Sequence, residues 1–151
     1  MQESMRTRLM RWGFNLFPVY RRTGGKVTFI SDEFRHIHIK IPLNWKTRNY
    51  VGTMFGGSMY GATDPIYMIM FMKILGPKYV VWDKAGKIRY KTPGRSTLRG
   101  NFSVEDAEIE LIRRELEMKE KLDRVYNVSL IDENGVECAM IEKTLHFSKK
   151  K

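Results

Sequence analysis

Cysteine is almost absent from this sequence, and long apolar runs are missing. Cys138 is the one cysteine in 151 residues, so no internal disulfide forms and a reducing cytoplasm is the expected setting. The longest apolar run, Pro65 to Met72, is far shorter than the roughly 20 residues that cross a bilayer. The start of the chain carries no basic-then-apolar secretion signal, and we expect a soluble protein without a transmembrane segment.

Acidic residues are the minority among the charged side chains. Asp and Glu number 17 against 27 Lys and Arg, which gives a formal net charge of +10 and points to an anionic partner. Nucleic acid is not the expected partner, because the basic residues lack interleaved aromatics and a recognition motif. Hydrophobic residues at 42% are ordinary for a globular chain, so we expect a single domain over 1–151.

The N-terminal segment has apolar residues at helical spacing, namely Met5, Leu9, Trp12 and Leu16. This spacing predicts an amphipathic helix over about 4–17 that ends near Pro18. We expect its apolar stripe to cover the core, and binding to a membrane surface is the alternative for a basic amphipathic helix.

The rest of the chain predicts an α+β fold in which antiparallel strands wrap around one buried helix. Ser103 and Asp106 have the spacing of a capping box that opens a surface helix running to about Lys121. Gly135 sits in a turn that joins the last two strands. The other predicted elements are strands within 26–41, the buried helix 58–75, strands 79–83 and 88–91 separated by a turn at 84–87, strand 97–104, and a hairpin of 124–131 and 136–147.

Glycines crowd the start of the predicted buried helix, at Gly52, Gly56, Gly57 and Gly61. Such a helix start offers unpaired N–H groups to an anion or to a developing oxyanion. Asp64 follows in an apolar stretch, where burial would raise its pKa and suit it to general-base catalysis. A second interpretation is structural, because Asp64 before Pro65 also has the pattern of a helix N-cap followed by proline.

The same segment resembles a known superfamily. The positions that match are Asn49, Gly52, Phe55-Gly56-Gly57 and Asp64, which resemble the Asn, Gly, His-Gly-Gly and Asp pattern of hotdog-fold thioesterases of the phenylacetate-pathway type. The resemblance spans roughly 26–148 and includes the strand that ends before Pro93. Phe55 replaces the His of that pattern and Pro65 directly follows the acid, as in a branch known mainly as a domain of unknown function.

The resemblance implies a hotdog fold, with an antiparallel sheet around a long central helix and an extra N-terminal helix. It implies a homodimer, or a tetramer of paired dimers, with acyl-thioester sites at the interface. Gly57 would polarise the thioester carbonyl through its N–H, and Asn49 would position water or substrate. Asp64 of the partner subunit would act as general base or nucleophile. The implied activity is acyl-CoA hydrolysis, and no metal or cofactor is expected beyond the coenzyme A of the substrate.

Further residues are candidates for substrate binding. Thr53, Phe55 and Gly56 belong to the matched segment, and the cations Arg89, Lys91 and Arg95 suit the phosphates of coenzyme A. A protein that binds an acyl thioester or lipid without turnover is the alternative function, since Phe55 removes a polar group.

Overall fold

Six strands form one antiparallel sheet in the computed structural model, which describes residues 1–151. The strands are β1 (Lys26–Ile30), β2 (His36–Ile41), β3 (Tyr79–Tyr90), β4 (Leu98–Ser103), β5 (Lys121–Ile131) and β6 (Glu137–Lys149). Their order in the sheet is β1-β2-β4-β5-β6-β3, so β1 and β3 lie at opposite edges. The helices are α1 (Met5–Leu16), α2 (Pro18–Arg22), α3 (Gly56–Thr63), α4 (Ile66–Leu75) and α5 (Asp106–Met118).

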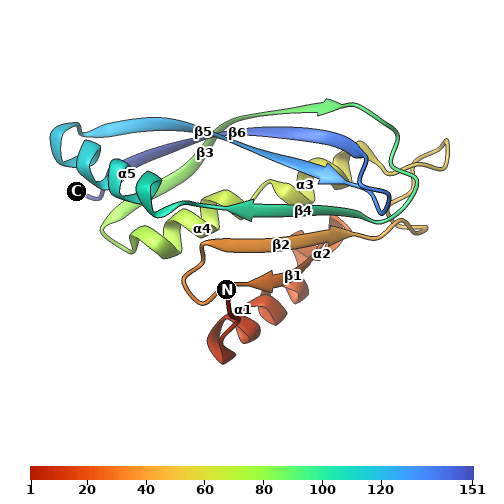
Figure 1. Ribbon diagram of the computed structural model, residues 1–151, viewed down its shortest axis with the longest axis horizontal. Helices are drawn as coiled ribbons and strands as arrows, with labels where there is room; N and C mark the ends of the chain where they lie inside the picture. Colours follow the sequence, from red (N-terminus) through yellow and green to blue (C-terminus); the bar gives the residue numbers. More distant parts are fainter.

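The central helix is built from α3 and α4, which run end to end along the sheet (Figure 1). Nearly every side of α4 is apolar, and Met70 and Phe71 are completely buried between the helix and the sheet. The expected sheet around a central helix is therefore confirmed. The predicted single helix is interrupted after Thr63, because Pro65 has no N–H to donate to the preceding turn. No helix is long and apolar enough to span a membrane.

Strand β3 is continuous, so the predicted turn at 84–87 is wrong. Its residues pair with β6 from Tyr79 opposite Lys149 to Tyr90 opposite Ala139. A bulge between Asp83 and Ala85 absorbs the irregular stretch without ending the pairing. The reason is tertiary: the 13 residues of β6 provide backbone partners for all of β3.

Helix α1 occupies the predicted range, but the prediction that its apolar stripe covers the core is wrong. Thr7 is buried, and Met10 and Phe14 pack on the core, whereas the stripe lies on the opposite side and is exposed. Asn15 sets this rotation, because its amide donates to the Val27 carbonyl and accepts from the Val27 N–H, both at 2.8 Å. The helix is thereby attached to edge strand β1 by its polar side chain.

Helix α5 begins later and ends earlier than predicted. Ser103 is still paired with His36 in the sheet, so the proposed capping box does not form and the first helical residue is Asp106. The final hairpin is confirmed as β5 and β6. In its turn, Gly135 has φ of +81°, a conformation that favours glycine.

Candidate active site

A cleft of about 570 Å³ opens between the start of α3 and the end of β3. The loop and helix start contribute Asn49, Thr53, Met54, Phe55, Gly56, Gly57 and Met59, and the end of β3 contributes Tyr90 to Pro93. Six residues singled out from the sequence therefore lie around one cavity: Asn49, Thr53, Phe55, Gly56, Gly57 and Lys91.

Asn49 organises the loop that precedes α3. Its side-chain oxygen accepts from the Thr53 N–H at 2.9 Å, and its amide donates to the Thr53 hydroxyl at 2.9 Å. The backbone N–H of Asn49 also donates to the Thr53 carbonyl. Within the chain, the Asn49 side chain thus holds the closed loop that presents the two glycines.

The start of α3 has two free hydrogen-bond donors. Ser58 and Met59 both donate their N–H groups to the Phe55 carbonyl, but the N–H groups of Gly56 and Gly57 have no acceptor within the chain. Unpaired N–H groups in the first turn of a helix, reinforced by the helix dipole, attract negative charge. The cleft therefore offers a site for an oxyanion or another anionic oxygen.

Two aromatic side chains lie directly against these glycines. A Cβ on Gly56 would come within 2.5 Å of the Tyr90 hydroxyl, and one on Gly57 within 2.4 Å of the Phe55 ring. Both distances are shorter than real contacts allow, so glycine lets the two rings approach the helix start. Phe55 is itself largely exposed and forms an apolar side of the cleft.

Asp64 belongs to a second cluster, of charged side chains, at the end of α3 opposite to the free N–H groups. Its Oδ1 accepts from Nζ of Lys143 at 2.5 Å, while its side chain remains 46% exposed. Lys143 comes from β6, is only 1% exposed, and also lies 3.2 Å from Asp83 Oδ1 and 3.4 Å from the Tyr60 hydroxyl. Asp64 itself has helical φ and ψ and caps no N–H group, so the alternative interpretation as an N-cap is wrong.

Charge and burial oppose each other within this cluster. Burial of Lys143 disfavours its charged form, but the carboxylates of Asp64 and Asp83 outweigh burial, and the pKa of Lys143 rises above its usual value. Burial raises the pKa of Asp83, and Lys143 offsets this rise only in part. Lys143 is therefore held as a buried cation, and its contact with Oδ1 fixes the position of the Asp64 carboxylate.

Gly57 and Asp64 share a face of the helix but do not meet within one chain. Seven residues separate them, which corresponds to about 10 Å along the axis and almost two full turns. That separation is too large for both groups to reach one carbonyl carbon. Arg89 and Arg95 are exposed outside the residues that line the cleft, and Lys91 at its rim pairs with Glu137 at 2.5 Å.

Several residues of these clusters were not predicted from the sequence, among them Lys143 with its neighbours Asp83 and Tyr60, and Tyr90. Lys143 occupies an inward position of β6 between Ile141 and Leu145. Tracing the period-two alternation through this strand would have identified Lys143 as a lysine on the apolar, inward-facing side. Tyr90 has no comparable signal, because its place over Gly56 depends on the crossing of β3 and α3.

The comparisons with solved structures identify the class of fold. A Pseudomonas aeruginosa protein of unknown function, described as a probable thioesterase, superposes with a TM-score of 0.85 at 14% identity over 99% of this chain and 100% of its own. A Chlorobaculum tepidum protein of unknown function has a TM-score of 0.76 at 14% identity, covering 96% and 95%. A Haemophilus influenzae thioesterase has a TM-score of 0.69 at 12% identity, covering 99% and 93%.

The chain accordingly has the hotdog fold, as the sequence motif predicted. The chain belongs to the family described as domain of unknown function DUF4442, whose model matches residues 6–147. No curated protein matches the sequence significantly.

Proposed function

We propose that this protein is an acyl-CoA thioester hydrolase that acts as a homodimer. The observation that supports this function best is that the same helix face has two free N–H groups at the cleft and, about two turns further on, a carboxylate held in place by Lys143. The resemblance to hotdog thioesterases gives the same assignment, and structural neighbours at low identity carry thioesterase descriptions.

A second copy of the chain supplies the missing half of each proposed site. The backbone of β3 has no strand beyond it and offers an edge for pairing. A two-fold axis that pairs two such edges also sets the two central helices antiparallel, which brings Gly57 of one subunit toward Asp64 of the partner subunit. Each dimer then has two equivalent sites.

The proposed reaction uses only water and residues of the chain. Asp64 takes a proton from a water molecule, and the water oxygen attacks the thioester carbon. The developing oxyanion is stabilised by the N–H of Gly57, with Gly56 beside it. When the C–S bond breaks, coenzyme A leaves as the thiolate and takes up a proton, and the carboxylic acid is released.

The substrate class follows from the chemistry of the rim and the floor of the cleft. Lys91 at the rim is paired with Glu137, whereas Arg89 and Arg95, nearby in sequence, have no acidic partner within the chain and suit the phosphates of coenzyme A. Met54 and Met59 are buried at the floor, and their flexible thioethers suit an acyl chain. Coenzyme A enters as part of the substrate, and the proposal requires no other cofactor.

A non-catalytic acyl-thioester-binding protein is the second candidate. It is favoured by Phe55, whose apolar ring lies against Gly57 where a histidine would offer a polar group. A thiol-release assay on short, long and aromatic acyl-CoAs distinguishes the two functions. Turnover supports the hydrolase, whereas binding of the same acyl-CoAs without thiol release supports the alternative.

Subunit mixing tests whether each site is shared between two chains. We expect Asp64→Asn and Gly57→Pro homodimers each to be nearly inactive, because each lacks one half of both sites. Random exchange of equal amounts makes heterodimers in which one site keeps both halves, so activity returns to about a quarter of wild type. Failure of the mixture to regain activity, with subunit exchange verified by mass, would contradict the shared site.

Removing one hydrogen-bond donor tests the proposed oxyanion site. Proline at position 57 lacks the N–H yet is tolerated in the first turn of a helix, and no existing hydrogen bond is lost. Gly57→Ala is the matched control, because it adds the same Cβ against Phe55 and keeps the N–H. We expect kcat of Gly57→Pro to fall about 10²-fold to 10³-fold below that of Gly57→Ala. Equal kcat values in two folded variants would remove Gly57 from the mechanism.

A further inference from the structure

Helix α1 presents an apolar stripe to solvent. The stripe consists of Met5, Leu9, Trp12 and Leu16, whose side chains are 62 to 68% exposed. Four large apolar side chains aligned on one helix face are uncommon on a surface that has no partner. Phe17 and Val19 continue the exposed apolar surface beyond the end of α1.

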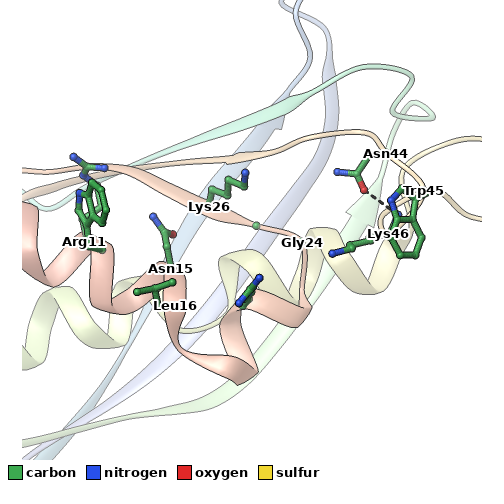
Figure 2. Close-up of a pocket in the computed structure, with 11 residues that line it drawn as sticks. Arg11, Asn15, Leu16, Gly24, Lys26, Asn44, Trp45 and Lys46 are labelled. Carbon is green, nitrogen blue, oxygen red and sulfur yellow. Dashed lines mark hydrogen bonds between the residues drawn. The ribbon is translucent and has the colours of Figure 1, made fainter.

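A basic cavity of about 570 Å³ lies beside this stripe, between α1, α2 and the loop that follows β2. Figure 2 shows Lys26 between Arg11 on one side and the pair Trp45 and Lys46 on the other. Trp12 and Leu16 of the stripe also line it, together with Arg11 and Arg21, so the stripe and the cavity form one continuous surface.

The cavity has cations that the chain does not neutralise. Arg11 is paired with Glu3 at 2.8 Å, but Arg21, Lys26 and Lys46 have no acidic partner within 4.0 Å. No Asp or Glu lines the cavity. The cavity therefore favours an anionic group, and a phosphate matches several separate Lys and Arg side chains.

The wall of the cavity is a constrained part of the backbone. Gly24 has φ of +81°, and a Cβ there would lie 2.2 Å from Cγ2 of Thr47. Thr47 is buried and its hydroxyl donates to the Pro42 carbonyl at 2.6 Å. The segments that hold Lys26 and Lys46 are thus packed together, and the cavity is already formed without a ligand.

A second copy of this chain is a poor occupant for this surface. In the proposed dimer the partner pairs along β3, and α1 packs on β1 at the opposite edge of the sheet (Figure 1). A contact between two such stripes would also bring the unpaired cations of two subunits together. A partner with an anionic surface and an apolar interior would match both the basic cavity and the apolar stripe.

We propose that the apolar stripe and the basic cavity dock the protein on an anionic phospholipid membrane. The stripe enters the boundary between headgroups and acyl chains, as amphipathic helices with a basic flank do. Exposed Trp12 and Trp45 suit the headgroup level, and the cavity takes a lipid phosphate. This surface is separate from the cleft, so the proposal does not depend on hydrolysis, although the exclusion of a second copy rests in part on the proposed dimer.

Flotation of the full-length protein with phosphatidylcholine vesicles, with and without phosphatidylglycerol, tests the proposal. We expect binding to the anionic vesicles, release at high salt, and a blue shift of tryptophan fluorescence on binding. Leu9→Glu should weaken the apparent affinity for the vesicles about tenfold, because it replaces an apolar side chain that is buried on membrane binding by a negative charge that faces anionic lipid. Leu111→Glu is the matched control: Leu111 is 41% exposed on α5, and its substitution should leave binding unchanged.

The cavity has its own variants. Arg21→Ala and Lys26→Ala should each weaken binding to anionic vesicles about fivefold, since each removes one charge near the surface. Absence of vesicle binding by the wild type would overturn the proposal. Equal binding of the Leu9→Glu and wild-type proteins would also overturn it. A Leu9→Glu variant that binds vesicles as the wild type does but forms a smaller oligomer would show that the stripe contacts a second copy of the chain instead.

Discussion

Replacing Asp64 by Asn is expected to lower kcat for acyl-CoA hydrolysis about 10³-fold while leaving the fold intact. Asparagine has nearly the same shape, and its side-chain oxygen can still accept the hydrogen bond from Lys143. The amide cannot take a proton from water, and general-base catalysis accounts for rate factors of about 10² to 10⁴. Substrate affinity should change little, because the acyl-CoA contacts proposed at the cleft remain.

The measurement is thiol release under saturating substrate, combined with thermal unfolding of the same samples. Asp32→Asn is the matched control, because Asp32 is also a half-exposed aspartate paired with a cation, Arg6, but is remote from the cleft. We expect wild-type kcat for the control. Full activity of a folded Asp64→Asn protein would remove Asp64 from the reaction and leave the mechanism without its base.

Lys143→Met is expected to lower the free energy of unfolding by about 3 kcal/mol at neutral pH. Methionine fills a similar volume, but removing the cation leaves the half-buried Asp83 carboxylate without its partner, and breaking a buried ion pair costs about 3 to 5 kcal/mol. Asp64 contributes less to this cost, because its exposed carboxylate can be hydrated. Activity should fall as well, since Asp64 loses the contact that fixes it.

The pH dependence of this deficit identifies its cause. Burial already raises the pKa of Asp83, and losing Lys143 raises it further. An acid whose folded pKa is raised destabilises the fold above that pKa, and the penalty disappears as pH falls through it. The stability gap between Lys143→Met and wild type should therefore narrow from pH 7 toward pH 4.

Denaturant unfolding at equal protein concentration measures the gap. The double variant Lys143→Met with Asp83→Asn should recover most of the lost stability at pH 7. Lys84→Met is the control, because the pair of Lys84 with Asp123 is exposed and screened by solvent, so its loss should change stability little. A deficit that is independent of pH and persists in the double variant would show that Lys143 acts through packing alone.

Much of the fold was predictable from local patterns. Alternating apolar residues predicted β2 and β4, and the turn at Gly135 predicted the last hairpin. The continuity of β3 was not predictable, since its polar middle resembles a turn. There, pairing with the whole of β6 determined the structure.

The candidate site divides in the same way. The glycines and Asn49 have a spacing that predicts a ligand-facing loop, and the structure brings these residues to one cleft. The partner of Asp64 was not predictable, because Lys143 lies 79 residues further along the chain. Only the packing of the helix on β6 brings the two charges together.

The sequence by itself determined which residues are apolar, where glycine permits unusual backbone, and which helix start has free donors, because these depend on side chains and local backbone. Only the tertiary structure decided which faces are covered. In α1, two apolar faces compete for the core, and the hydrogen bonds of Asn15 to β1 turn Leu9 outward. In β6, an inward lysine is stable only because two carboxylates lie beside it and outweigh the cost of burying its charge, and this depends on contacts between distant segments.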